Sequence, residues 1–196
     1  MKLQEAIDKR RSIRGFEPKK VPKEIIQELV KNAIKAPNAG NRQPWIFYCV
    51  DDEKKRDEIS KLLFKQFKRL WKQIKAKSKK SQKVANNFYQ NLGNAQNLIF
   101  VYRRKEINEP VYVKPNDMLS IACAMENLML CAVEKGLGTC WIGTFNGPKI
   151  AKELGKILKV KNNEELVGSL VIGYPKKNFK PFNKKLKKLN EILKFI

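Results

Sequence analysis

The chain has 196 residues, with 42 Lys and Arg against 19 Asp and Glu, a formal net charge of +23, four Cys and no His. The missing histidine excludes Ser-His-Asp and Cys-His hydrolases, His-ligated metal centres and a histidine general base. The cysteines form no C-x-x-C pair and nothing at the N-terminus is typical of an export signal, so we expect reduced thiols, a cytoplasmic location and no metal site.

The first quarter of the chain predicts two helices and a strand. Apolar residues at helical spacing indicate a short helix that starts near Leu3, and a second one over residues 25–34, after Pro22 and before Pro37. Residues 45–50 are rich in aromatic and β-branched residues and are bounded by turn-forming residues, so they predict the first strand.

The next segment is strongly basic. Residues 54–83 hold 13 Lys or Arg and 2 acidic residues, net +11. Apolar residues recur there at spacings of three and four, so the lysines form the hydrated face of an amphipathic helix. The apolar positions are Ile59, Leu62, Leu63, Phe67, Leu70, Trp71 and Ile74. The low-complexity stretch Lys75 to Lys83 predicts a loop or a frayed helix end. A nucleic-acid or anionic-membrane surface is the alternative, but it would need exposed stacking aromatics.

The second half of the chain continues the alternation of strands and helices. The segment from Met118 to Val133 is apolar almost all round, which is typical of a helix buried on several sides, and Gly136 is placed to cap it. It is too short and too polar for a membrane span. The other predicted elements are strands at Asn97–Tyr102, Cys140–Phe145 and Leu166–Ile172, and a helix from Pro148 to about Leu158.

These elements favour a single α+β domain, residues 1–196, with a mixed sheet flanked by helices. Residues 176–196 hold 8 Lys and 1 acidic residue, net +7, and repeat apolar residues at helix-like spacing. Such a stripe must be buried, either on its own domain or on a second subunit. Together with the apolar helix over residues 118–133, the tail argues for a dimer.

Three segments have the residue types for binding chemistry. Arg10-Arg11-Ser12-Ile13-Arg14 sets three guanidiniums and a hydroxyl beside a helix end, and this pattern suits the oxygens of a phosphate. The alternative interpretation is a solvated basic turn.

The second segment is the loop Pro37-Asn38-Ala39-Gly40-Asn41-Arg42-Gln43-Pro44-Trp45. Its three carboxamide side chains both donate and accept hydrogen bonds, which suits the edge of a heteroaromatic ring. An ordinary turn rich in Asn and Gly is the alternative.

The third segment, Gly136-Leu137-Gly138-Thr139-Cys140-Trp141-Ile142-Gly143, follows a helix and opens a strand. A dinucleotide-binding fingerprint has the opposite order and needs Gly or Ala where Trp141 stands, so that interpretation fails. Its glycines would let backbone amides approach a ligand closely, or would simply make a tight turn.

In this order and at these distances, the three segments resemble the nitroreductase family of FMN-dependent oxidoreductases. The resemblance covers about residues 10–45 and 117–175, and Glu126-Asn127 and Gly173-Tyr174-Pro175 also agree with it. It implies a mainly antiparallel central sheet flanked by helices, an FMN-binding fold and an intertwined homodimer. The basic helical insertion at about 54–94 resembles nothing specific, and the tail 176–196 would pack on the partner subunit.

The resemblance also implies a set of cofactor-binding residues. Arg10, Ser12 and Arg14, with Arg11 beside them, would hold the FMN phosphate and the ring edge. The carboxamide loop of the partner subunit would line the isoalloxazine through Pro37, Asn38, Ala39, Asn41 and Gln43, although Asn38 stands where the family has Ser. Backbone amides of Trp141, Ile142 and Gly143 would lie near flavin N5. Lys184, or else Lys185, would complete the phosphate site where the family commonly has an Arg-containing pattern.

The implied activity is hydride transfer from NADH or NADPH through flavin N5 to a nitroaromatic, quinone or similar acceptor, with ping-pong kinetics. The cofactor carries the chemistry, so no catalytic side chain is required and a chain without histidine can perform it. Two alternatives stay open. One is another flavin reaction, such as dehalogenation or flavin fragmentation, and the other is a basic nucleic-acid-binding module that keeps a flavin-type fold.

Overall fold

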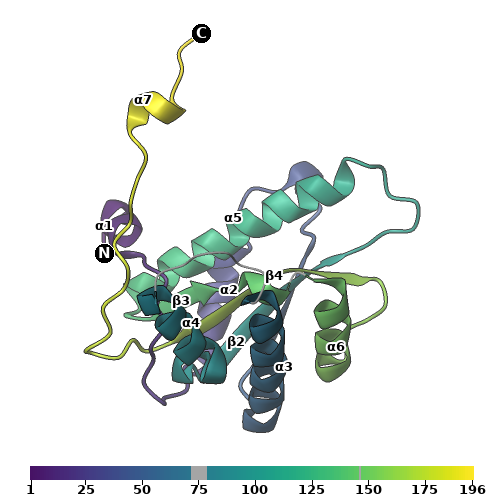
Figure 1. Cartoon of the computed structure of the whole chain (residues 1–196). Helices are drawn as coiled ribbons and strands as arrows, with labels where there is room; N and C mark the ends of the chain where they lie inside the picture. The colour runs from purple at the N-terminus through teal and green to yellow at the C-terminus, as the bar shows by residue number, and fades with distance from the viewer. Residues whose placement is uncertain (72–78, 146) are drawn as a thin grey trace.

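The structure, a computed structural model that describes residues 1–71, 79–145 and 147–196, is organised around one open antiparallel sheet (Figure 1). Its strand order is β1-β2-β4-β3. The strands are β1 Trp45–Val50, β2 Asn97–Arg104, β3 Gly138–Trp141 and β4 Glu164–Gly173. All three strand pairings are antiparallel, which confirms the predicted α+β class with a mainly antiparallel sheet.

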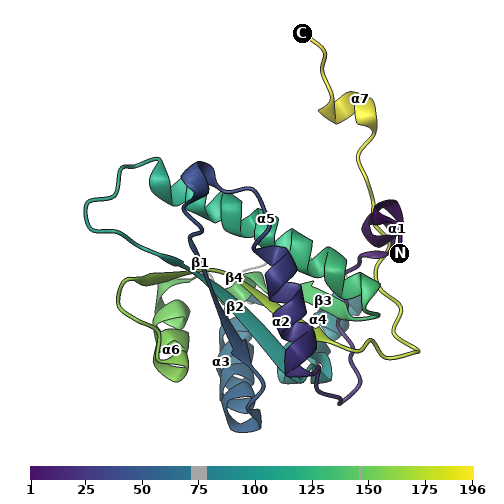
Figure 2. The same cartoon turned by 180° about the vertical axis from the view of Figure 1, so that it is seen from behind.

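The alternation of side chains along β2 divides the apolar core into two layers. Leu98, Phe100 and Tyr102 point to one face and Ile99 and Val101 to the other, as the period of two in a strand requires. The face of Ile99 is covered by α2 and α5, and the opposite face by α3, α4 and α6 (Figures 1 and 2). These helices are α2 Lys23–Ala33, α3 Glu53–Trp71, α4 Lys79–Asn91, α5 Val113–Glu134 and α6 Pro148–Leu158.

The N-terminal segment closes the sheet beside β3. After α1 (Leu3–Lys9), Ser12 forms a parallel bridge with Thr139, and Phe16 an antiparallel bridge with Pro175. The amide of Phe16 donates to the carbonyl of Gly93 at 2.8 Å, in the short turn η2 (Leu92–Asn94) that follows α4. Segments from both ends of the chain and from the basic insertion therefore meet at one edge of the sheet.

The predicted third strand, Cys140–Phe145, is wrong in its second half. β3 ends at Trp141, and Gly143–Phe145 form a 3-10 turn, η3. Ile142 and Phe145 are both buried, and their spacing of three fits a helical turn but not the alternation of a strand. The other predicted strands and helices are confirmed, and α5 begins five residues earlier than the predicted Met118.

The basic insertion forms two helices, α3 and α4, and the apolar stripe in its first half predicts the first of them. Ile59, Leu63 and Phe67 are buried on α3, whereas predicted stripe residue Ile74 lies outside the described residues. The expectation of a loop or frayed end over residues 75–83 is wrong for residues 79–83, which are helical in α4. Residues 75–78 of that expectation lie outside the described residues.

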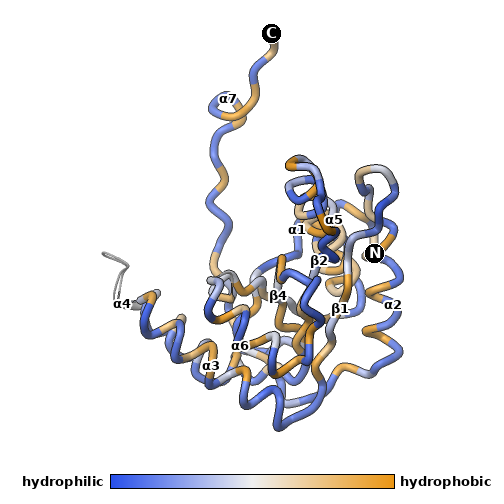
Figure 3. Tube along the Cα trace, turned by 90° about the vertical axis from the view of Figure 1, so that its right-hand side faces the viewer, coloured by the Kyte–Doolittle hydropathy of each residue, from blue (hydrophilic) through white to orange (hydrophobic). Residues whose placement is uncertain are grey.

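The C-terminal tail extends away from the body of the domain (Figures 1 and 3). It holds a single helical turn, α7 Leu189–Ile192, and every residue from 183 to 196 is exposed. Of the two ways to bury its apolar stripe, folding back onto its own domain is therefore wrong. Packing on a second subunit stays a prediction.

Two glycines with left-handed backbone conformations provide a test of how the insertion meets the N-terminal segment. A Cβ on Gly93 (φ +64) would lie 2.4 Å from the carbonyl oxygen of Arg14, whereas a Cβ on Gly136 (φ +70) would meet nothing within 4 Å. We expect Gly136→Ala to cost about 1 kcal/mol of unfolding free energy, from backbone strain alone. Gly93→Ala adds a steric clash and should cost about 3 kcal/mol or more. Urea unfolding of both variants measures this, and equal losses would contradict the close approach of η2 to Arg14.

Candidate functional site

The arginine-rich segment lies directly against β3. The amide of Ile13 donates to the carbonyl of Thr139 at 2.9 Å. This approach depends on Gly138, because a Cβ there would lie 2.7 Å from Cγ1 of Ile13. The sequence Arg10 to Arg14 is thus brought beside the glycine-containing turn, so two of the three predicted segments meet within one chain.

Lys184 joins this segment from the C-terminal tail, and Arg10, Arg11 and Lys184 together are called the cationic cluster below. Nζ of Lys184 donates to the carbonyl of Ile7, in α1, at 3.2 Å. Desolvation lowers the pKa of Lys184, and the positive charges of Arg10 and Arg11 lower it further. The side chain of Lys185 makes no hydrogen bond or ion pair within the described residues.

The three cations of the cluster have two carboxylates near them, those of Asp8 and Glu126. Glu126 lies 3.5 Å from Nε of Arg10, and the guanidinium of Arg11 donates to the carbonyls of Asp8 and Arg10. Three cations that raise one another's energy form a site that an anion would stabilise. Sequence reasoning could identify the two arginines, but it could not choose between the two lysines.

Arg14 points to the other side of the segment. Its guanidinium donates to the carbonyl of Ser12 at 3.4 Å and lies 5.9 Å from the ring centroid of Phe182. Burial raises the pKa of both Cys140 and Tyr89, and the positive charge of Arg14 opposes the shift in each. The guanidinium therefore lies near β3 and α4, apart from the cationic cluster.

The last residue of β3, Trp141, and the turn that follows it, with Ile142 and Gly143, hold the three predicted residues. The side chain of Trp141 is partly exposed, and a Cβ on Gly143 would meet no atom within 4 Å, so the turn borders open space. The amide of Ile142 donates to the carbonyl of Ser169 at 2.8 Å, which means that this amide is already engaged inside the protein.

The carboxamide loop has a rigid internal structure. It contains the short turn η1 (Ala39–Asn41), and Gly40, Asn41 and Gln43 all have left-handed backbone conformations. Oδ1 of Asn38 accepts from the amide of Gln43 at 2.9 Å, and Nε2 of Gln43 donates to Oδ1 of Asn41 at 3.3 Å. Pro37 and Ala39 are exposed on the same loop. These bonds hold the backbone in a conformation that non-glycine residues adopt rarely.

A network of charged side chains anchors this loop to α5. Arg42, within the loop, donates to Asp117 at 3.2 Å and to Glu106 at 2.9 Å. Asp117 also accepts from Arg103 of β2 at 3.1 Å, and both of these residues are only 1% exposed. Arg103 pairs in addition with Glu109 and, at 2.9 Å, with Glu165 of β4. Our sequence reasoning missed this network, although an Arg in an apolar strand and an Asp at the start of an apolar helix were its signal.

Within one chain, the carboxamide loop and the cationic cluster do not meet. The loop contacts the first half of α5, where the amide of Ala39 donates to Ser120 Oγ at 3.4 Å. The N-terminal segment contacts the second half, where the N-terminal amine pairs with Glu134. Figures 1 and 2 show α1 at one end of α5 and the loop at the other. No hydrogen bond or ion pair joins the two segments in the described part of the chain.

An apolar face of α5 lies between these two segments and is open to solvent. Leu119 is 66% exposed, Met118 is 42% exposed, and Cys123 is exposed on the next turn. The expectation that this helix is buried on several sides thus holds for only part of its circumference in a single chain. Exposed apolar surface of this kind marks a site of interaction with a macromolecule.

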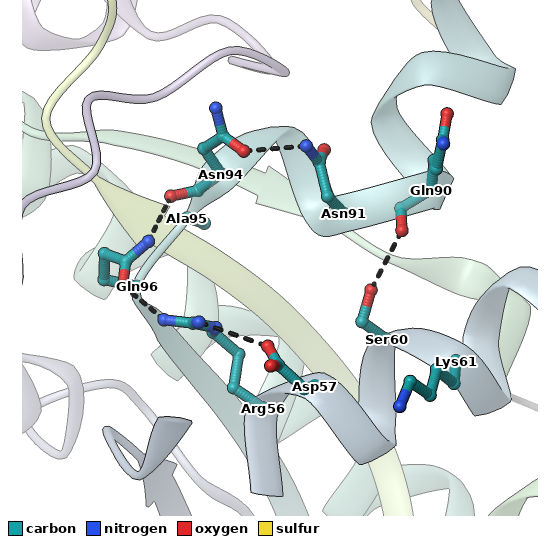
Figure 4. Close-up of a pocket in the computed structure, with 9 residues that line it drawn as sticks. All are labelled: Arg56, Asp57, Ser60, Lys61, Gln90, Asn91, Asn94, Ala95 and Gln96. Atoms are coloured by element: carbon teal, nitrogen blue, oxygen red, sulfur yellow. Dashed lines mark hydrogen bonds and ion pairs between the residues drawn. The ribbon is translucent and has the colours of Figure 1, made fainter. Parts of the chain in front are cut away.

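A separate polar pocket of about 200 Å³ lies between α3 and η2 (Figure 4). Its polar side chains bond to one another: Asn91 donates to Asn94 at 2.7 Å, and Ser60 donates to the carbonyl of Gln90 at 3.4 Å. Arg56 bonds to Gln96 and Asp57 there. Because these groups satisfy one another, the pocket offers little to a ligand.

The described residues offer neither a membrane-spanning helix nor a metal site. No helix in these ranges combines the length and the apolar character that crossing a membrane requires. In residues 1–71, 79–145 and 147–196, no three His, Cys, Asp or Glu side chains gather in a way that could hold a metal ion.

Comparison with known proteins gives a consistent result. The family model described as "Nitroreductase family" matches residues 7–174. A protein of Archaeoglobus fulgidus named "Putative NADH dehydrogenase/NAD(P)H nitroreductase" is 30% identical over 169 residues, covering 85% of this chain and 82% of its own. Mouse "Iodotyrosine deiodinase 1" is 28% identical, covering 96% of this chain and 67% of its own. The crystal structure of a "BluB-like flavoprotein" from Clostridium difficile 630 is 26% identical, with a TM-score of 0.77, covering 100% and 99% of the two chains.

The buried pair Arg103–Asp117 yields a stability prediction. Asp117→Ala leaves a buried guanidinium with one partner fewer, so we expect a loss of about 3–5 kcal/mol of unfolding free energy. Glu106→Ala removes an exposed partner of Arg42 and should cost less than about 1 kcal/mol. Hydrogen exchange of the Ala39–Gln43 amides should accelerate in Asp117→Ala, because the loop loses its anchor.

A double variant separates the lost attraction from the cost of the remaining charge. Arg103→Met with Asp117→Leu should cost clearly less than the sum of the two single variants, because neither Arg103 nor Asp117 is then left buried without the other. Strict additivity in urea unfolding would mean that the two side chains do not interact.

Proposed function

The chain belongs to the nitroreductase family, and from this membership we propose that it is an FMN-dependent oxidoreductase which takes a hydride from NAD(P)H and reduces a small aromatic or quinone-like acceptor. The observation that carries the proposal is the cationic cluster beside the glycine-containing turn. Four free cysteines are in keeping with a reducing compartment, which supports a cytoplasmic location.

The cationic cluster fits a phosphate monoester. Arg10 and Arg11 supply planar guanidinium donors and Lys184 supplies an ammonium, while Ser12 adds a hydroxyl on the same segment. A dianionic phosphate would relieve the mutual repulsion that lowers the pKa of Lys184. We assign Lys184 to the phosphate site, and Lys185 remains the second choice because the structure gives it no contact there.

The C-terminal end of β3 supplies groups for a planar ring. Trp141 and Gly143 border open space beside β3, and Arg14 lies on the side of Cys140. A cation at that position favours a ring system that becomes anionic on reduction. We therefore propose that Arg14 contacts the ring edge and that the turn of Trp141, Ile142 and Gly143 faces the reactive part of the ring.

In the proposed mechanism, the protein binds and orients FMN and the substrates. The chain has no histidine that could transfer a proton. Bound FMN would supply the hydride-transfer chemistry, first with the reduced nicotinamide and then with the acceptor. Arg10, Arg11 and Lys184 would hold the phosphate, and Arg14 would stabilise negative charge at the ring edge. Because donor and acceptor would use one pocket in turn, ping-pong kinetics are expected.

The site needs a second copy of the chain. The carboxamide loop, with Pro37, Asn38, Ala39, Asn41 and Gln43, lies away from the cationic cluster of its own chain. In a homodimer that pairs the exposed α5 faces, the loop of one protomer would line the ring held by the other. The exposed part of the tail 176–196, residues 183–196, would then find a surface on the partner.

A second candidate reaction is reductive dehalogenation of an aromatic ring. The observation that favours it is the similarity to mouse iodotyrosine deiodinase 1 over 96% of this chain. Both reactions would use the same bound FMN, and they differ only in the acceptor.

We do not propose nucleic-acid binding for the basic insertion. Phe67 is buried, and its ring stacks on Tyr89 with 4.3 Å between centroids and packs against Trp71 at 5.0 Å. These aromatics are used within the protein, so the lysines of α3 lack the exposed rings on which bases stack.

The proposal predicts that the purified protein is yellow and binds one FMN per chain. The loaded protein should oxidise NADPH or NADH in the presence of a nitroaromatic, with parallel lines in double-reciprocal plots. Iodotyrosine as sole acceptor tests the second candidate, by iodide release. A colourless protein that cannot be reconstituted with FMN would refute both reactions.

Lys184→Gln and Lys185→Gln form a matched pair for the phosphate site. Loss of one charge-assisted bond in Lys184→Gln should weaken FMN binding about tenfold or more, whereas Lys185→Gln should change it less than about threefold. Fluorescence quenching of FMN measures both affinities, and the reverse order would move the phosphate site to Lys185.

The dimer predicts the behaviour of Leu119→Asp. A carboxylate in the centre of the α5 face would be desolvated in the interface, so the variant should elute as a monomer and lose FMN. Light scattering and circular dichroism check mass and folding together. A folded Leu119→Asp dimer that retains FMN would show that this face is not the interface.

A further inference from the structure

A second cleft lies at one end of the sheet, between α6, the ends of β2 and β4, and Lys114 at the start of α5. Its volume is about 930 Å³, which is large enough for a nucleotide. Its walls are α6, residues 159–162 after α6 and Lys105 after β2. Tyr102 of β2 also lines it. None of the residues assigned above to the flavin site lines it.

The charge of this cleft is positive and unpaired. Five lysine side chains that line it make no ion pair or hydrogen bond within the described residues. They are Lys105, Lys152, Lys156, Lys159 and Lys161.

The carboxylates that line the cleft are already engaged. Glu109 and Glu165 pair with Arg103, and Glu165 also pairs with Lys114 at 2.6 Å. Glu164 accepts a hydrogen bond from the Tyr48 hydroxyl at 2.5 Å. The groups left to meet a ligand are therefore cationic.

The hydroxyl of Tyr102 is an independent sign that the cleft has an occupant. Tyr102 is 2% exposed, and its hydroxyl has no hydrogen-bond partner in the described part of the chain. The ring of Tyr48 packs edge-on against it at 5.2 Å and does not satisfy it. Burial raises the pKa of Tyr102, so the hydroxyl stays protonated and is a donor. A buried donor without an acceptor is costly, and a ligand oxygen would remove that cost.

The spacing of the lysines indicates more than one phosphate. Lys152 and Lys156 are four residues apart on α6, about 6 Å along the helix axis, and Lys105, Lys159 and Lys161 lie outside α6. A single phosphate cannot reach all of these ammonium groups. The cleft runs along the length of α6, from Pro148 at its first position to Lys159 at its C-cap.

We propose that this cleft is a second anion site, which binds the diphosphate group of a nucleotide, with the lysines of α6 on the phosphates and the Tyr102 hydroxyl donating to a ligand oxygen. The C-terminal tail of this chain does not fit, because its net charge of +7 repels the lysines. The diphosphate could come from a free nucleotide or from NAD(P)H, and the second source rests on the function proposed above.

The test uses the flavin-loaded protein and ADP as the probe. We expect ADP to bind by calorimetry, with an affinity that falls as salt is raised. The triple variant Lys152→Gln, Lys156→Gln, Lys159→Gln should bind ADP at least about 20-fold more weakly. The control Lys54→Gln, Lys61→Gln, Lys65→Gln removes the same charge from exposed positions of α3 and should bind ADP like the unmodified protein.

Tyr102→Phe tests the buried hydroxyl without a change in packing. ADP affinity should fall about tenfold, the value of one hydrogen bond to a charged group. The melting temperature without ADP should stay equal or rise, because the variant removes an unsatisfied donor. A lower melting temperature with unchanged ADP affinity would show that the hydroxyl has a partner inside the protein and would overturn its role.

The kinetic arm distinguishes the two sources of the diphosphate. If the triple variant raises KM for NADPH and leaves kcat unchanged, the donor's diphosphate occupies the cleft. If KM is unchanged while ADP binding is lost, a free nucleotide does. Absence of ADP binding to the unmodified protein, or equal binding to the triple variant and the control, would overturn the proposal. Neither result would affect FMN binding, so a failure here is distinct from a failure of the proposed function.

Discussion

The buried pair of Arg103 and Asp117 is the interaction on which the arrangement of the site depends. Both side chains are almost fully removed from water, which costs several kcal/mol per ion unless each finds partners of good geometry. Arg103 meets this requirement with carboxylates from α5, from β4 and from the loop before α5. Asp117 uses its remaining oxygen to accept from Arg42. The same pair that joins sheet and helix therefore fixes the carboxamide loop.

The anchoring explains why the molecule divides its binding groups between two ends of one helix. The carboxamide loop is held at the first half of α5, and the cationic cluster forms near the second half. The apolar face of α5 between them is open. In the homodimer that we propose, pairing of two such faces would complete two sites at once and bury the exposed apolar residues. A chain without histidine would suit this arrangement, because a bound flavin would supply the chemistry and the protein would supply charge and position.

The large positive charge has a local organisation that its total does not show. On α3 the lysines surround an apolar stripe whose aromatics are packed inside the protein. On and just after α6 they line a cleft that Tyr102, whose hydroxyl has no partner in the described residues, also lines. Beside α1 a single lysine, Lys184, lies near Arg10 and Arg11, and desolvation and these two charges lower its pKa. A positive side chain therefore has a different environment on α3, on α6 and beside α1, because the groups packed around it differ.

The sequence by itself determined the elements whose signals are local. Periodicity of two and of 3.6 placed the strands and helices, Gly136 and Pro148 marked helix ends, and three short motifs indicated the family. Only the tertiary structure showed that Cys140–Phe145 turns after Trp141, that Lys184 reaches α1, and that Arg103 meets Asp117. These outcomes depend on groups that lie far apart in the chain, up to 177 positions for Lys184 and Ile7. Local preference and spacing report how a segment folds, whereas burial and charge pairing depend on which distant segments the fold brings against it.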